Sequence, residues 1–111
     1  MKGKIFLVPF PFDDLSSTKV RPAIALTEPI GAFRHVIVAF ISSKVPDELL
    51  ESDLIIKQSE KDFGKTGLRV DSVIRVHRLT TVTTALFRRE LGQLPPALQS
   101  ALEARVKKLF A

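Results

Sequence analysis

The sequence of 111 residues contains no cysteine and only two histidines, and these absences exclude several kinds of site. A chain without cysteine has no disulfide framework, no thiolate nucleophile and no cysteine-based zinc site. His35 and His77 are far apart in the sequence, which leaves little for a histidine-based metal site. We therefore expect a protein that works without a metal or another cofactor.

Long hydrophobic runs and large aromatic side chains are scarce as well. The longest apolar runs, such as residues 36–41, are far too short to cross a bilayer. The first four residues, Met1-Lys2-Gly3-Lys4, lead into a strand-like segment rather than a signal peptide, so we expect a cytoplasmic protein with no membrane partner. Tryptophan and tyrosine are absent, which leaves few aromatic platforms on which bases could stack.

The remaining composition is typical of one globular domain over residues 1–111, because 45% of the residues are hydrophobic and 26% are charged. Residues 1–64 hold eight Lys or Arg and nine Asp or Glu, whereas residues 65–111 hold nine and three. A one-sided basic excess favours a polyanionic partner, with nucleic acid first and an acidic protein second. The alternative is a charged surface that only keeps the protein soluble.

Short runs rich in Val and Ile, separated by turn residues, indicate a small antiparallel β protein. We expect strands at residues 3–8, 20–27, 34–41, 53–57 and 70–79, then a turn plus strand within 85–93. The third should be central because it is apolar on both faces. Residues 64–67 are predicted to form a flexible turn. From Pro95 the pattern is helical, with apolar residues spaced by four, four and three: Leu98, Leu102, Val106 and Leu109.

Three polar clusters stand at the ends of apolar strands, where a small barrel would place its loops. The first contains Arg21, whose direction is restricted by Pro22 and whose guanidinium suits phosphate oxygens. The others are a hydroxyl-rich strand end and a basic strand edge, Ser42-Ser43-Lys44 and Arg75-Val76-His77-Arg78. Each has a structural alternative: an Arg21 ion pair with Asp13 or Asp14, a strand stop, and a solvent-facing row.

Other motifs that carry chemistry are missing. The sequence has no nucleophile elbow, Walker loop, dinucleotide fingerprint or zinc pattern, so enzymes built on those motifs are excluded. Four carboxylates would suffice for Mg²⁺, but leucines interrupt them and we expect a solvated loop: Asp47, Glu48, Glu51 and Asp53.

Taken in order, several segments resemble the MazF/PemK family of bacterial toxins. The most specific part is Pro9-Phe10-Pro11-Phe12 followed by Arg21-Pro22, and the match runs from Gly3 to the final helix. The resemblance implies a mainly β fold, a small SH3-like barrel of the MazF/PemK/CcdB type with a C-terminal α-helix. It further implies a homodimer that cleaves single-stranded RNA without a metal and is neutralised by a cognate MazE-like antitoxin. The segments concerned are residues 5–12, 14–17, 19–23, 38–43, 71–74 and 79–81.

The family's catalytic residues fall on Arg21 and Ser42, where serine replaces the family's threonine and Ser43 offers an adjacent hydroxyl. The implied reaction is attack of a ribose 2′-hydroxyl on the neighbouring phosphorus, which gives a 2′,3′-cyclic phosphate and a 5′-hydroxyl. The general base stays open between His77 and Asp14. Further RNA contacts are expected from Lys19, Ser43, Lys44, Arg75, His77 and Arg78.

Two other functions are compatible with such a fold. One is a gyrase-inhibiting toxin-like protein, although this chain lacks the C-terminal tryptophan tip of that group and ends in a helix. The other is a non-catalytic nucleic-acid binder, which would need only the basic face. Metal-free cleavage of RNA separates the nuclease from both.

Overall fold

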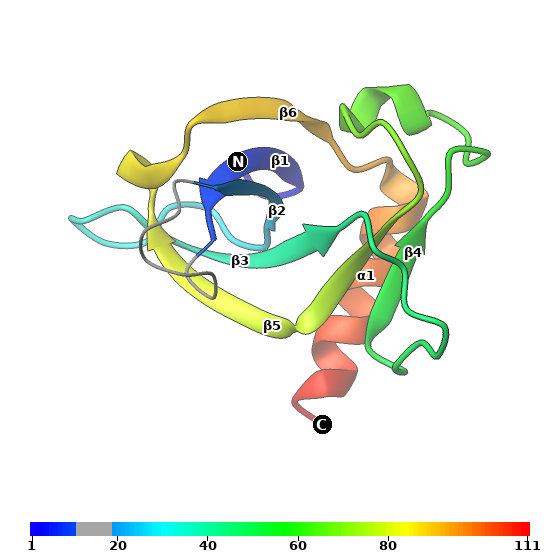
Figure 1. Ribbon diagram of the computed structural model, residues 1–111. Coiled ribbons are helices and arrows are strands. Elements are labelled where there is room, and N and C mark those ends of the chain that lie inside the picture. Colours follow the sequence, from blue (N-terminus) through cyan, green and yellow to red (C-terminus); the bar gives the residue numbers. More distant parts are fainter. Residues whose placement is uncertain (11–18) are drawn as a thin grey trace.

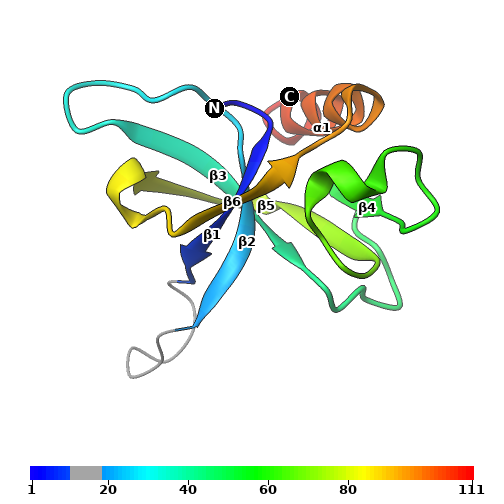
Figure 2. The same ribbon diagram turned by 90° about the horizontal axis from the view of Figure 1, so that it is seen from above.

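A computed structural model of the chain describes residues 1–10 and 19–111. It contains a six-stranded antiparallel sheet in the order β4-β5-β3-β2-β1-β6, two short 3₁₀ helices and one α-helix. Figures 1 and 2 show that the sheet curls into a half-barrel, with the α-helix lying beside β4 and β5. The elements are β1 (Lys4–Pro9), β2 (Val20–Ala25), β3 (His35–Ser42), β4 (Asp53–Ile56), η1 (Phe63–Thr66), β5 (Ser72–Thr83), η2 (Thr84–Leu86), β6 (Arg89–Gln93) and α1 (Pro96–Leu109).

The predicted mainly β class with a C-terminal helix is confirmed, and β3 lies between β5 and β2 as its two apolar faces indicate. The strand β5 is longer than predicted. It continues to Thr83 because Thr80–Thr83 pairs with the first half of β3, with Thr83 opposite His35. No helix in the described part of the chain is long and apolar enough to span a membrane.

Residues 64–67 turn the chain as predicted, since the amide of Gly67 donates to the carbonyl of Gly64 at 3.3 Å, and the turn is part of the short 3₁₀ helix η1, which spans residues 63–66. The side chain of Thr66 is completely buried, and its hydrogen bonds stabilise the end of the 3₁₀ helix. Its hydroxyl donates to the carbonyl of Phe63 at 2.7 Å and accepts from the amide of Leu68 at 3.1 Å. Turn-forming glycines therefore stand here in an ordered element that packs against β6.

Apolar side chains are buried on both faces of the curled sheet. On one face Ile5, Ile24 and Ile74 pack with Leu98 and Leu102 of α1. On the other face the core contains Phe6, Val8, Ala23, Ala25, Val36, Val38, Phe40 and Val82. This alternation follows from the two-residue period of a strand, and it leaves strand ends, rather than strand centres, for polar groups.

Pro95 precedes the helix α1, which starts at Pro96 and carries two lysines in its last turn. A proline in the first turn lacks an N–H that would have no partner there, and Lys107 and Lys108 complement the negative end of the helix dipole. Arg105 fastens the helix to β4, since its Nε donates to the carbonyl of Asp53 at 3.0 Å. The helix thus covers one end of the half-barrel and leaves the start of β2 and the end of β3 uncovered (Figure 2).

Candidate functional site

Strand pairing brings Arg21 and Ser42 to the same edge of the molecule. In the antiparallel pair of β2 and β3, Ala23 lies opposite Phe40. The same register continued by two residues sets Arg21 opposite Ser42. Both residues line one open pocket of about 160 Å³, here called the site pocket.

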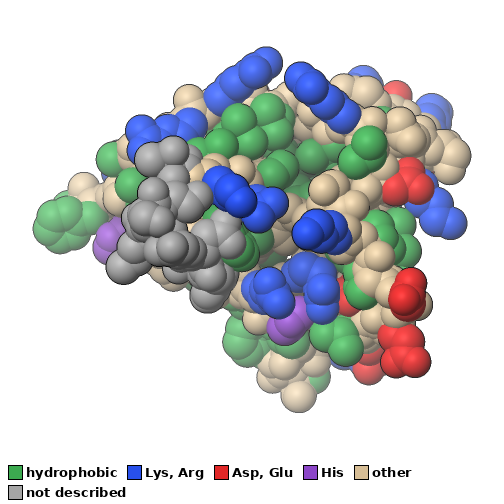
Figure 3. Space-filling view, in the orientation of Figure 1, with side chains coloured by type: hydrophobic (Ala, Val, Ile, Leu, Met, Phe, Trp, Pro, Cys, Tyr) green, Lys and Arg blue, Asp and Glu red, His purple; other side chains and the backbone are tan. Residues whose placement is uncertain are grey.

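The site pocket is strongly cationic. Besides Arg21 and Ser42 it is lined by Lys44, Arg75 and Arg78, so five of the eight predicted site residues meet there. Its apolar wall consists of Phe10, Phe40 and Ile41, and no carboxylate lines it among the described residues. Figure 3 shows Lys and Arg side chains across the middle of this face, with acidic side chains toward its right edge. Such a pocket favours a phosphate group.

Aromatic contacts hold Arg21 in place. The Cζ atom of Arg21 lies 5.4 Å from the centre of the Phe10 ring, which is within the range of a cation–π contact. The Phe10 ring in turn meets Phe40 edge-to-face, with ring centres 5.0 Å apart. Because Phe40 is buried in the core, the guanidinium rests on a rigid support.

The hydroxyl of Ser42 is oriented by the turn that ends β3. The amide of Lys44 donates to Ser42 Oγ at 3.1 Å, as expected for a serine that stops a strand. This bond uses a lone pair of the oxygen and leaves the hydroxyl proton free to be donated. Ser42 can therefore act as a strand stop and as a donor to a ligand in the site pocket.

Arg75 is positioned by an ion pair with a buried acid. Its Nε lies 2.8 Å from Oδ1 of Asp53, and the Asp53 side chain is fully buried. The other carboxylate oxygen of Asp53 accepts from the amide of Leu50 at 2.9 Å. The prediction of a solvated acidic loop is therefore wrong for Asp53, although Asp47, Glu48 and Glu51 are exposed. No group of metal-ligating side chains occurs among the residues that the structure describes.

Three predicted residues lie outside the site pocket. Ser43 lines a neighbouring pocket, whereas Lys19 and His77 are exposed and line neither of the two. The candidate acids Asp13 and Asp14 lie outside the described residues.

The neighbouring pocket, here called the flanking pocket, has a volume of about 300 Å³ and shares Arg21 and Ile41 with the site pocket. It adds two arginines that the sequence analysis did not select, Arg69 and Arg89. Both lie in the basic second part of the chain and next to a strand end. These two features are the sequence signals that could have identified them as candidate RNA-binding residues.

Comparison with known families gives a clear result. The sequence profile of PemK-like, MazF-like toxins of type II toxin-antitoxin systems matches residues 1–110. The chain belongs to this family. No curated protein matched the sequence.

Solved structures confirm the toxin fold. A Mycobacterium tuberculosis toxin, MazF-mt6, superimposes with a TM-score of 0.72 at 22% identity, over 96% of this chain and 95% of that one. A mycobacterial endoribonuclease in complex with its cognate antitoxin gives 0.70 at 10% identity, over 99% and 93%. A further M. tuberculosis toxin gives 0.61 at 23% identity, over 79% and 90%. At such identities the likeness defines the fold alone.

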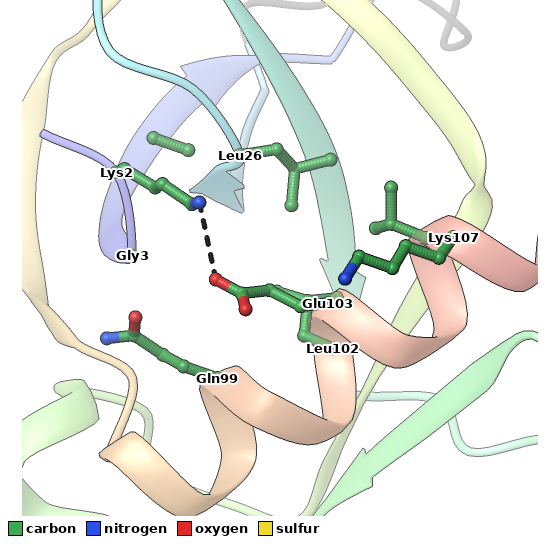
Figure 4. Close-up of a pocket in the computed structure, with 9 residues that line it drawn as sticks. Lys2, Gly3, Leu26, Gln99, Leu102, Glu103 and Lys107 are labelled. Atoms are coloured by element: carbon green, nitrogen blue, oxygen red, sulfur yellow. Dashed lines mark ion pairs between the residues drawn. The ribbon is translucent and has the colours of Figure 1, made fainter.

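A groove elsewhere on this toxin contains none of the candidate residues. It has a volume of about 370 Å³ and lies between the N-terminal segment, the end of β2 and α1. Figure 4 shows Lys2 and Glu103 pointing toward one another across it, and their charged atoms are 3.3 Å apart. Its two lysines, Lys2 and Lys107, are accompanied by the carboxylate of Glu103, so the groove is less cationic than the site pocket.

Asp53→Asn should destabilise the fold by about 2 kcal/mol, because it removes the charge that Arg75 faces in a buried environment. This loss of stability is smaller than is usual when one partner of a buried ion pair is removed, because the Arg75 side chain is 21% exposed. Urea unfolding measures the change. The matched control is Glu51→Gln, which breaks the exposed ion pair with Lys108 and should cost less than about 1 kcal/mol. Equal losses in the two variants would contradict the assignment.

Proposed function

We propose that the protein is a metal-independent endoribonuclease toxin that cleaves single-stranded RNA. The observation that carries the proposal is the meeting of Arg21 and Ser42 in one cationic pocket. Membership in the MazF-like toxin family supports it. In the proposed reaction a ribose 2′-hydroxyl attacks the adjacent phosphorus and the bond to the 5′-oxygen breaks, which leaves a 2′,3′-cyclic phosphate and a 5′-hydroxyl.

Negative charge develops on the equatorial phosphate oxygens as the 2′-oxygen approaches. The guanidinium of Arg21 supplies paired donors to these oxygens, and Ser42 adds a hydroxyl donor from the opposite strand. Donors that are held in place before reaction each contribute a few kcal/mol, on the order of 3, to such a transition state. Lys44, Arg75 and Arg78 line the same pocket and can hold neighbouring phosphates.

Removal of the proton from the 2′-hydroxyl needs a separate acceptor. A guanidinium stays protonated at neutral pH and is therefore a poor base, so Arg21 serves as an electrostatic group. His77 does not line the site pocket, and Asp14 lies outside the described residues. The described residues that line the site pocket stabilise the negative charge of the transition state. The general base is therefore a group outside this lining.

The same proposal includes a cognate antitoxin and action in the cytoplasm on messenger RNA. The family is defined by type II toxin-antitoxin systems, and one structural neighbour is described as bound to its cognate antitoxin. An acidic antitoxin segment would complement the cationic site pocket and block RNA. We also propose a homodimer, which sedimentation of the purified toxin tests directly.

The nuclease proposal is tested by incubating the purified, antitoxin-free protein with single-stranded RNA in excess EDTA. We expect cleavage that EDTA does not reduce. The upstream fragment should end in a 2′,3′-cyclic phosphate, and the downstream fragment should begin with a free 5′-hydroxyl that polynucleotide kinase can phosphorylate without prior phosphatase treatment. A double-stranded RNA of the same sequence is the control and should stay intact. Intact single-stranded RNA with a folded protein would overturn the proposal, and binding without cleavage would favour the non-catalytic nucleic-acid binder.

A further inference from the structure

The flanking pocket continues directly from the site pocket. Arg21 and Ile41 line both, so a polynucleotide whose phosphate lies at Arg21 reaches the flanking pocket with the next nucleotide. The flanking pocket has a volume of about 300 Å³, compared with about 160 Å³ for the site pocket. The smaller pocket suits a phosphate group, and the larger one has room for a base.

The lining of the flanking pocket combines apolar walls with two guanidinium groups. Leu68 and Leu91 form half-buried walls, and Arg69 and Arg89 stand on separate segments of the chain. Neither arginine makes an ion pair with an acid in the described ranges 1–10 and 19–111. Both are exposed, so their donors are available to a ligand.

The acids next to these arginines in sequence are already engaged. Asp71 accepts from the amide of Gln58 at 2.7 Å, and Glu90 lies 3.4 Å from the Nζ of Lys4. Ser72 offers little to a ligand, because it is buried and its hydroxyl donates to the carbonyl of Val70 at 2.9 Å. The pocket therefore presents mainly donors to whatever enters it.

The segment that carries Arg69 is fixed before any ligand binds. The side chain of Gln58 donates to the carbonyl of Arg69 at 2.9 Å, and buried Thr66 holds the amide of Leu68. Gly67 has a φ of 74° and approaches β6 so closely that a Cβ there would lie 2.1 Å from the carbonyl oxygen of Leu91. This contact joins the wall near Arg69 to the strand of Arg89, as preorganised recognition requires.

We propose that the flanking pocket holds the nucleobase next to the scissile phosphate and selects guanine, an inference that rests on the proposed nuclease function. Arginine can only donate hydrogen bonds, and guanine presents two adjacent acceptors, O6 and N7, on one edge. Adenine and cytosine place an amino donor at the corresponding position, and uracil offers a single acceptor there. The apolar walls contact the faces of the base.

The test is a map of cleavage sites on a mixed-sequence single-stranded RNA, read by sequencing the ends. Wild-type protein should show guanine enriched about tenfold at one position adjoining the cut. Arg69→Ala and Arg89→Ala should lose this enrichment and keep other sequence preferences. Arg89→Lys should lose it as well, because lysine keeps the charge but not the paired donors.

Arg88→Ala is the matched control, since it removes the same charge one residue away and Arg88 does not line the flanking pocket. It should keep the guanine enrichment. The proposal is overturned if wild-type cuts show no guanine beside the cleaved bond, or if the Arg69 and Arg89 variants retain it. Thermal unfolding of each variant confirms that the protein compared is folded.

A binding measurement separates failure of this proposal from failure of the nuclease proposal. Fluorescence anisotropy with 2′-fluoro oligonucleotides, which cannot be cleaved, compares guanine with 7-deazaguanine, which lacks the N7 acceptor. Wild type should bind the guanine oligonucleotide about fivefold more tightly, and Arg89→Ala should bind both equally. This discrimination without RNA cleavage would support the pocket and reject the nuclease, whereas cleavage without discrimination would reject the pocket alone.

Discussion

Arg21→Ala should reduce the rate of RNA cleavage at saturating substrate at least about 100-fold, the largest effect expected from any single side chain of the site pocket. The variant removes a positive charge and two aligned donors from the point where phosphate charge develops. The rate constant is measured under single-turnover conditions with a labelled RNA that contains one cut site. Because Arg21 is exposed, the fold should tolerate the change.

Three further variants separate the chemistry of Arg21 from its charge. Arg21→Lys keeps the charge and loses the planar fork, so it should recover only a small part of the rate. Ser42→Ala removes one neutral donor and should cost about tenfold. Arg34→Ala removes an exposed arginine from the β2–β3 connection, outside both pockets, and should cleave normally. Wild-type rates for Arg21→Ala would exclude Arg21 from catalysis.

The position of the site pocket was predictable because the register of β2 and β3 determines which residues meet at the strand ends. Arg21 stands two residues before Ala23, the first β2 residue paired with β3, and Ser42 ends β3, so an antiparallel pair with apolar centres must bring the two polar ends together. The apolar alternation around them gave the strands nearly at their observed ends. The support of Arg21 by Phe10 is harder to foresee, since a phenylalanine at the end of an apolar strand usually packs in the core.

Other features depended on contacts between distant segments that no local pattern records. Asp53 stood in an acidic stretch, and only the pairing of β4 with β5, which sets Asp53 opposite Arg75, explains its burial. Residues 64–67 contain two glycines, typical of a turn, and the burial of Thr66 against the sheet decides that this turn belongs to the 3₁₀ helix η1 over residues 63–66. Arg69 and Arg89 lie twenty residues apart, so their shared pocket depends on how closely η1 approaches β6.

Gly92→Ala should lower the free energy of unfolding by about 3 kcal/mol, which corresponds to a fall in Tm of about 12 °C. A Cβ on Gly92 would lie 2.1 Å from the carbonyl oxygen of Lys65 and 2.5 Å from the carbonyl carbon of Thr66. Both are backbone atoms of η1, so no flexible side chain can yield, and η1 must move away from β6. Calorimetry measures the change.

Gly64→Ala is the matched control, because η1 leaves open space around a Cβ at Gly64 and its φ is not in the left-handed region. This variant should unfold within about 0.5 kcal/mol of wild type. Displacement of η1 also moves the wall of the flanking pocket and leaves β2 and β3 in place. Gly92→Ala should therefore still cleave RNA at temperatures where it is folded, but with weaker guanine enrichment beside the cut. Equal stability of the two alanine variants would show that η1 adapts to the added methyl group. It would contradict the claim that η1 forms a rigid wall of the flanking pocket, on which the proposed selection of guanine depends.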